Sequence, residues 1–332
     1  MKKVFTLIII SLLLYSCYST KHLQTNEYIL KNNIITIEKN QNFEDKKITK
    51  SEIKMILKQN PNKKILGLIP FHMWIYNISN PNKKNWTNNY LRKIGEKPIK
   101  IETDLIKKSQ QQIKSYVENN GFFNSSVTSK ILYKKNTANI YYNIIPGSSY
   151  LVRNINYDLI QNEEIHKILN TKNRQTSLIN NTFFNYNTLN DERILIEKLL
   201  QNNGYYKFSK DLIYFKADSS DKKYIDLDVV LQDIQNDSSL YNKFYINNVF
   251  ISLDENMPQL DTIIKNDYYF FTEKNKKIDI KLDILSNLIT IKKHELYSKK
   301  TAEKTYKNLS NLTFFKKIRI EFIELKETNK LD

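Results

Sequence analysis

The side chains that most often catalyse reactions or bind metal ions are thinly spread in this sequence. Its four histidines are far apart, and none has a second histidine four positions away or a cysteine beside it. They are His22, His72, His166 and His294. Zinc sites usually draw on closely spaced histidines and cysteines. We therefore expect no metal site.

Acidic pairs and glycines do not indicate catalysis either. Glu163 and Glu164 stand where a helix is expected to begin, so their charges would offset the helix dipole. Asp279 and Asp283 alternate along an expected strand face. The five glycines lie too far apart for a phosphate-binding loop or a G-x-S-x-G elbow. We expect no catalytic residue and no cofactor, and so a protein that is not an enzyme.

The positive charge of the chain is spread along its length. The 332 residues include 52 Lys and Arg against 35 Asp and Glu, a net charge of +17. Clustered Lys and Arg would be typical of nucleic-acid binding, but these lysines are scattered beside Asn, Asp and Pro, as on solvated turns. We expect no nucleic-acid partner. A cationic body does fit an anionic membrane surface.

The only cysteine, Cys17, follows a short apolar stretch. Residues 4–15 are apolar, come after two lysines, and are fewer than the ~20 needed to span a bilayer. The stretch ends in Leu-Tyr-Ser-Cys over residues 14–17, which resembles a bacterial lipobox. The alternative is an ordinary secretory leader that ends at a chance cysteine.

The lipobox predicts how the chain is processed and where it is held. We expect a signal peptide over residues 1–16, cleavage between Ser16 and Cys17, an acylated Cys17 and a lipidated linker over residues 17–26. Residues 18–23 contain no acid. By resemblance to bacterial lipoproteins, this indicates the periplasmic face of the outer membrane of a Gram-negative bacterium.

A five-residue motif recurs along the chain and marks internal repeats. Its copies are Asn119-Asn120-Gly121-Phe122-Phe123, Asn202-Asn203-Gly204-Tyr205-Tyr206 and a degenerate Asn311-Leu312-Thr313-Phe314-Phe315. Each copy follows a helical apolar pattern, and the glycine would stop the helix. The second helices are expected around residues 105–117, 189–200 and 302–309.

Strand patterns surround each helix pair. Opening strands are expected at residues 28–38, 150–157 and 244–251, with a bulge around Asn154 and around Asn248. First helices are expected after a Thr49–Glu52 capping box, at 163–169 and at 260–265. Closing strands are expected at 125–133 and 137–145, at 208–216 and 223–232, and at 317–322. The predicted fold class is α+β, with repeats of strand, helix, helix, strand and strand.

This repeat resembles the POTRA domain of BamA/TamA-type outer-membrane assembly proteins. The lipobox and the insertion over residues 61–100 make it most similar to the TamL-like lipoproteins of Bacteroidetes. The resemblance predicts three tandem repeats, at 27–148, 149–235 and 243–332. The third is expected to be truncated before its last strand, with no barrel in this chain. His294 stands where the family usually has glycine, before Glu295-Leu296-Tyr297.

The resemblance implies a periplasmic POTRA arm for protein assembly or translocation in the outer membrane. Its partners would be unfolded outer-membrane proteins or subunits of an assembly complex, bound by strand addition. The candidate edge residues are Ser125, Val127, Ile131, Phe208, Leu212 and Tyr214. The alternative is a stand-alone or remnant lipoprotein of the cell envelope without insertase activity.

An apolar patch within the insertion has two interpretations. Phe71, Trp74 and Tyr76 form an aromatic cluster. The favoured interpretation is a hydrophobic plug under the first repeat. The other is a surface that faces membrane or a partner.

Replacing Cys17 with alanine should leave the chain soluble and uncleaved by the lipoprotein signal peptidase, because acylation and recognition both require the cysteine. Membrane fractionation and mass spectrometry of the N-terminus test this expectation. Unchanged acylation and processing in Cys17→Ala would refute the lipid anchor.

Overall fold

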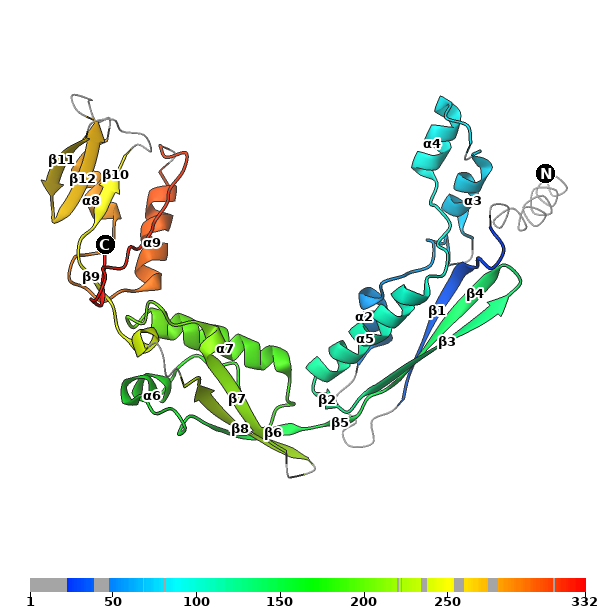
Figure 1. Ribbon diagram of the computed structural model, residues 1–332, viewed down its shortest axis with the longest axis horizontal. Helices are drawn as coiled ribbons and strands as arrows, with labels where there is room; N and C mark the ends of the chain where they lie inside the picture. The colour runs from blue at the N-terminus through cyan, green and yellow to red at the C-terminus, as the bar shows by residue number, and fades with distance from the viewer. Residues whose placement is uncertain are drawn as a thin grey trace. The chain divides into compact units, whose positions relative to one another are not determined.

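The computed structural model describes most of the chain beyond residue 22 (Figure 1). The described ranges are 23–38, 48–67, 69–80, 82–219, 221, 223–233, 238–253, 260–273, 280–312 and 314–332. The predicted signal peptide, Ser16, Cys17, His22 and Asp279 lie outside them. The chain divides into two compact bodies. The first comprises the described residues up to Leu151 with Phe183–Tyr186, and the second Val152–Thr182 with Asn187–Asp332.

The first body is built on a three-stranded sheet with the order β1-β4-β3. β1 (Ile29–Ile37) runs parallel to β4 (Thr137–Ile145), and β3 (Ser126–Lys134) pairs with β4 in antiparallel fashion. Side chains of the central strand alternate between buried and half-exposed. Those that face the core are Ala138, Ile140, Tyr142 and Ile144. The expected strands at 28–38, 125–133 and 137–145 are therefore confirmed to within about one residue.

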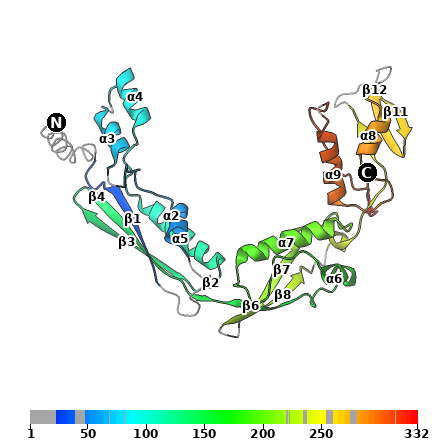
Figure 2. The ribbon, with the colours of Figure 1, turned by 180° about the vertical axis from the view of Figure 1, so that it is seen from behind.

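Two helices cover one face of this sheet (Figures 1 and 2). α2 (Lys50–Ile56) begins at a capping box, in which Thr49 and Glu52 bond each other's backbone amides as expected. α5 (Thr103–Asn119) ends two residues before Gly121, whose φ of 81° is left-handed and suits glycine. Ile53, Ile106, Ile113 and Val117 from these helices pack on the sheet.

The predicted insertion over residues 61–100 contains two further helices. They are α3 (Phe71–Ile78) and α4 (Trp86–Ile94). The backbone amide of Glu96 donates to the carbonyl of His72 (2.9 Å). A Cβ on Gly95 would lie 2.4 Å from the backbone nitrogen of Tyr76, so only glycine permits this close approach. The two helices therefore pack closely as a hairpin.

The second sheet has the order β6-β8-β7. Its strands are β6 (Leu151–Asn156), β7 (Ile213–Asp218) and β8 (Tyr224–Leu231), and β7 is antiparallel to β8. α6 (Glu163–Leu169) matches the predicted helix at both ends, and α7 (Tyr186–Gln201) precedes Gly204. Two short 3-10 turns complete this repeat. η2 (Lys210–Leu212) directly precedes β7, and η3 (Ser238–Tyr241) comes after β8.

The third sheet differs from the prediction. Its order is β10-β12-β11, with β10 (Phe250–Ser252) parallel to β12 (Tyr268–Glu273). β11 (Leu260–Lys265) is a strand, so the helix expected at 260–265 is wrong. Asn266 and Asp267 both have positive φ, 49° and 64°, as the two central residues of a type I′ hairpin require. That turn and three β-branched residues in β11 outweigh the helical pattern.

Two helices follow the third sheet, and strand pairing resumes only near the C-terminal end of the sequence. α8 (Leu282–Leu288) and α9 (Lys299–Ser310) follow the hairpin. Asp283 lies on α8, so the strand expected there is wrong. The segment 317–322 forms no strand either, although its polarity alternates. Pairing starts only at Ile323, whose backbone exchanges two hydrogen bonds with Asp332 (2.8 and 2.9 Å).

The opening strand of the third repeat is divided near Asn248. β9 (Tyr245–Ile246) runs parallel to β13 (Lys330–Leu331), and β10 begins four residues after β9 ends. Asn247 and Asn248 lie between them and donate side-chain hydrogen bonds to the Asp332 carboxylate (2.8 and 3.4 Å). His294 has a φ of 66°, a left-handed conformation that explains why glycine would suit this position.

No helix in the described part of the chain is both long enough and apolar enough to cross a bilayer.

Alanine at Gly147 should destabilise the first body. Gly147 directly precedes β5 (Ser148–Ser149), which pairs with β2 (Phe122–Phe123). A Cβ on Gly147 would lie 1.6 Å from the Phe123 carbonyl oxygen. We expect a loss of about 1–3 kcal/mol in the free energy of unfolding. Urea denaturation followed by circular dichroism tests this. The neighbouring Ser148→Ala should change that energy by less than about 0.5 kcal/mol; an equal loss in both variants would contradict the steric cause.

Candidate functional site

β3 presents an open backbone edge. It is the outer strand of the first sheet, and a two-residue turn joins Lys134 to Thr137 of β4. Such a turn makes these residues a hydrogen-bonded pair, so the N–H and C=O groups of every second residue point away from β4. These outward residues are Val127, Ser129, Ile131 and Tyr133. The Val127 carbonyl accepts from Gln110 Nε2 (3.3 Å), so α5 covers one end of the edge.

The side chains of β3 divide between core and solvent. Val127 and Ile131, two of the predicted edge residues, are half-buried and pack against the core. Leu132 and Tyr133 at the far end of the strand are 43% and 56% exposed. Ser125 is buried and lies just before the strand. The edge therefore offers backbone groups from Ser129 to Tyr133, and exposed apolar side chains at the end that is far from Val127.

β7 is the corresponding edge of the second sheet. The Gln232 amide donates to the Leu212 carbonyl (2.8 Å), so the backbone groups of Ile213, Phe215 and Ala217 point away from β8. Of the residues predicted here, only Tyr214 lies on the strand, and its side chain is 38% exposed.

The predicted strand at 208–216 begins too early. Phe208 is 1% exposed and belongs to the core, and Leu212 ends η2. The Ser209 hydroxyl accepts from the Asp211 amide (3.3 Å), which stabilises the turn and delays the strand to Ile213.

Charged pairs span the strands of the second sheet. Arg153 on β6 donates from Nε to Asp226 on β8 (3.0 Å), and Asn156 donates to Asp228 (3.1 Å). The hydrogen bond from Arg153 holds the pKa of Asp226 below its usual value. These pairs link the opening strand to the central strand through side chains as well as backbone.

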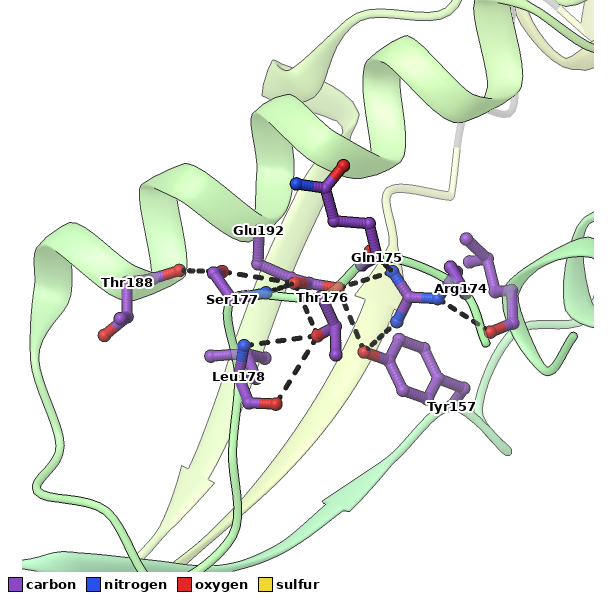
Figure 3. A network of polar contacts seen from close by, with 9 residues as sticks. Tyr157, Arg174, Gln175, Thr176, Ser177, Leu178, Thr188 and Glu192 are labelled. Atoms are coloured by element: carbon purple, nitrogen blue, oxygen red, sulfur yellow. Dashed lines mark hydrogen bonds and ion pairs between the residues drawn. The ribbon is translucent and has the colours of Figure 1, made fainter. Parts of the chain in front are cut away.

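A buried ion pair lies beside α7 (Figure 3). The Glu192 side chain is fully buried, and the Arg174 side chain is 7% exposed. Arg174 Nη1 donates to Glu192 Oε1 (2.7 Å), and Arg174 Nη2 donates to the Tyr157 hydroxyl (2.5 Å). Tyr157 donates in turn to Glu192 Oε1 (3.1 Å). The guanidinium also lies over the Tyr157 ring, 5.0 Å from its centre.

Further donors saturate the other oxygen of the Glu192 carboxylate. Thr176 Oγ1 donates to Oε2 (2.7 Å), as does the Ser177 amide (2.8 Å), and the Ser177 hydroxyl donates to the Thr188 carbonyl of α7 (2.8 Å). Arg174 Nε donates to the carbonyl of Leu169 at the end of α6 (2.9 Å). The network therefore joins α6, α7 and the segment between them into one structure (Figure 3).

Opposing effects set the pKa values in this network. Burial alone would raise the pKa of the Glu192 carboxyl, but hydrogen bonds from Arg174, Thr176 and Ser177 outweigh it and hold that pKa below its usual value. Burial and the neighbouring carboxylate raise the pKa of Tyr157 to about 12. At neutral pH Glu192 is ionised and Tyr157 is protonated. The arrangement is saturated, which suits a structural role.

The paired aromatics of the repeated motif have separate roles. Phe122 and Tyr205, the first of each pair, are 2% and 1% exposed and lie in the cores beside their own helices. The second of each pair packs on chain that follows. Phe123 contacts the Tyr150 ring (5.3 Å between centres), and Tyr206 contacts the Tyr297 ring (4.9 Å). In the degenerate third copy, Phe314 is 57% exposed.

The predicted apolar patch does not form a plug in the first body. Phe71 is 44% exposed, and Trp74 and Tyr76 are half-buried in the α3–α4 hairpin. The hydrophobic core of the first body, as far as the structure describes it, contains no residue from 61–98.

The histidines and acidic pairs of the sequence are dispersed. His72 contacts the Ile94 carbonyl (3.2 Å), and His166 contacts Asn170 (2.9 Å). Glu163 and Glu164 lie in the first turn of α6, as predicted. Asp283 pairs with Lys265 (2.6 Å). Within the described ranges, no group of three or more histidine, cysteine or acidic side chains could hold a metal ion.

A comparison with protein-family models assigns the first repeat. Residues 36–147 match the family model POTRA, described as a surface antigen variable number repeat. This range takes in α2, α5, β3 and β4, and is about a third of the chain. The POTRA prediction is confirmed for the first repeat. No curated protein matches the chain.

Solved structures of POTRA-containing proteins align with most of the chain. Haemophilus influenzae BamA POTRA3-5 is 13% identical with a TM-score of 0.43, covering 94% of this chain and 97% of that one. The N-terminal domain of Omp85 from Thermosynechococcus elongatus is 10% identical with a TM-score of 0.29, covering 93% and 96%. POTRA1-3 of Omp85 from Anabaena is 10% identical with a TM-score of 0.28, covering 93% and 94%. These scores are too low to show a common fold over the whole chain.

Replacing Glu192 with alanine should strongly destabilise the second body, because the Arg174 guanidinium would stay buried without its carboxylate. We expect a loss of about 3–5 kcal/mol in the free energy of unfolding at pH 7. Asp191→Ala, the neighbouring exposed acid on α7, should change that energy by less than about 0.5 kcal/mol. Urea denaturation followed by circular dichroism measures both.

The loss of unfolding free energy caused by Glu192→Ala should be smaller in acid. Because the folded-state pKa of Glu192 is lowered, its stabilisation is complete above the unfolded-state pKa, about 4.3, and disappears as pH falls through the lower folded value. A difference between parent and Glu192→Ala that stayed constant from pH 7 to acid would contradict an ionised pair.

Proposed function

We propose that this chain is the periplasmic POTRA arm of an outer-membrane protein assembly or translocation factor, and that it is not an enzyme. Its partners are unfolded outer-membrane proteins or subunits of an assembly complex. The observation that carries the proposal is the open edge of β3 in the repeat that matches the POTRA model. We extend the POTRA assignment to the second repeat, at 149–235, because its sheet has the same order of opening, central and edge strand and the same helices between them. We extend it also to the third repeat, at 243–332, whose sheet has the same spatial order although its central and edge strands precede its helices.

Strand addition is the mode of binding that this edge supports. Beyond the end of β3 that α5 covers, Ser129, Ile131 and Tyr133 direct backbone groups outward, and backbone groups recognise an extended chain whatever its sequence. Sequence tolerance suits a factor that receives many different strands. β7 offers a second, shorter edge of the same kind.

The lipid anchor completes the proposal. We propose that Cys17 is acylated, as in TamL-like lipoproteins, and holds the chain at the periplasmic face of the outer membrane. Two or three acyl chains, at about 0.8 kcal/mol for each buried methylene, are enough for stable attachment. The anchor would concentrate both edges near the membrane in which clients are inserted.

Proline at Ser129 tests strand addition on β3. The Ser129 amide points outward, so proline removes a donor from the open edge and leaves the pairing with β4 intact. We expect a urea-unfolded outer-membrane β-barrel protein, diluted into buffer, to bind about tenfold more weakly, as the loss of one or two hydrogen bonds implies.

Ser129→Ala is the matched control, since it keeps the amide and should bind within about twofold of the parent. Circular dichroism and thermal melting establish that each variant is folded. Undiminished binding by a folded Ser129→Pro would place the partner site elsewhere.

A further inference from the structure

The α3–α4 hairpin extends from the end of the first sheet where β1 begins and β3 ends (Figures 1 and 2). Lys100, just beyond the hairpin, bridges to Ile29 at the start of β1. The hairpin is held by its own contacts, including those of Gly95 and His72 with the opposite helix. It is a defined element of the first body, outside that body's core.

α4 turns an apolar stripe toward solvent. Trp86, Tyr90 and Ile94 are spaced four residues apart, so they share one face of the helix. They are 77%, 57% and 40% exposed, and no residue of α4 is buried. A helix of a soluble protein normally packs such a stripe inward. On α4 this stripe faces solvent instead of the core.

The surrounding surface is also apolar. Eight of the 26 large apolar side chains that are exposed in the described ranges fall within residues 65–94. They are Ile65, Leu66, Ile69, Phe71, Ile78, Trp86, Tyr90 and Ile94. Exposed apolar surface concentrated in this way marks an interaction site.

The charge of this segment selects the kind of partner. Between Glu52 and Glu96 the sequence contains no acidic residue but eight Lys and Arg. Lys83 and Lys84 lie just before α4, and Lys93 lies near its end; all three are exposed. Trp and Tyr beside Lys are typical of helices that lie in a membrane interface, where rings enter the headgroup region and ammonium groups meet phosphates.

We propose that the α3–α4 hairpin docks on the surface of an anionic phospholipid bilayer through Trp86, Tyr90 and Ile94, with Lys83 and Lys84 facing the headgroup phosphates. This docking proposal rests on the proposed function in one respect only, namely that the chain is held near a membrane. Fully extended, the chain from Cys17 to Ile29 spans at most about 40 Å. An acylated Cys17 would therefore keep the hairpin within reach of the bilayer, and docking would orient the first body.

The only two tryptophans of the chain, Trp74 and Trp86, both lie in this hairpin, so their fluorescence reports on it alone. Trp74→Phe leaves Trp86 as the single probe in the full chain. The test mixes this variant with vesicles of phosphatidylglycerol and phosphatidylethanolamine whose acyl chains are brominated. We expect the bromine to quench Trp86 and the bilayer to protect it from iodide in the buffer.

Charge reversal identifies the anionic headgroup. Lys83→Glu with Lys84→Glu should weaken vesicle binding at least about 30-fold, because each lysine near the surface contributes about fivefold. Lys107→Glu with Lys108→Glu, an equal change at exposed positions on α5, should alter it by about twofold or less. Tyr90→Ser should also weaken binding, and it removes an exposed side chain, so the fold is retained.

Three results would overturn docking on lipid. One is Trp86 that stays open to iodide and unquenched by bromine. Another is equal weakening by both pairs of charge reversals. The third is a change in Trp86 emission with protein concentration and no vesicles, matched by a dimer in sedimentation, which would assign the face to a second copy. The Cys17→Ala test measures acylation and the Ser129→Pro test measures client binding. Failure of the proposed function is therefore distinguishable from failure of lipid docking by the hairpin.

Discussion

Parallel pairing between the opening strand and a later central strand is the constraint on which the rest of the fold depends. Parallel neighbours cannot be joined by a tight turn, so the chain must cross over between them. In the first body the crossover contains α2, α5 and the α3–α4 hairpin, and the helices α2 and α5 cover the sheet. β3, which precedes the central strand β4 in the chain, can then pair only with the side of β4 that faces away from β1. The open edge of β3 is a direct result of this order.

Local patterns in the sequence were enough to predict most elements. β4 and α6 have the predicted bounds, and the Thr49–Glu52 capping box forms. These elements depend on periodicity and caps, which neighbouring residues carry. The repeated Asn-Asn-Gly motif was equally informative, because its glycine ends a helix and its first aromatic enters a core. The strand predicted at 125–133 does lie at a sheet edge, as β3, whereas the polar turn at Ser209 delays the start of β7 by five residues from the predicted 208.

What the sequence could not predict depends on partners far along the chain. Glu192 occupies the apolar face of α7 with Leu189 and Ile196, and a carboxylate in that position signals a buried cation. Its partner, Arg174, comes from an irregular segment that no periodicity marks. β11 illustrates the same limit, since its apolar spacing fits helix and strand alike, and the turn at Asn266 and Asp267 decides between them. The segment 317–322 alternates in polarity yet forms no strand, so alternation alone does not make one.

The hairpin of β11 and β12 changes how the third sheet can form in time. In the first sheet, parallel pairing must bring Ile29 to Thr137, across more than a hundred residues. In the third sheet, β10 pairs with β12 between Phe250 and Tyr269, which are close in sequence. A two-residue turn joins β12 to its other neighbour, β11. Closing a short loop loses less chain entropy, and local contacts form sooner. The third sheet can therefore assemble early from a short stretch of chain, whereas the first must wait for its distant strand.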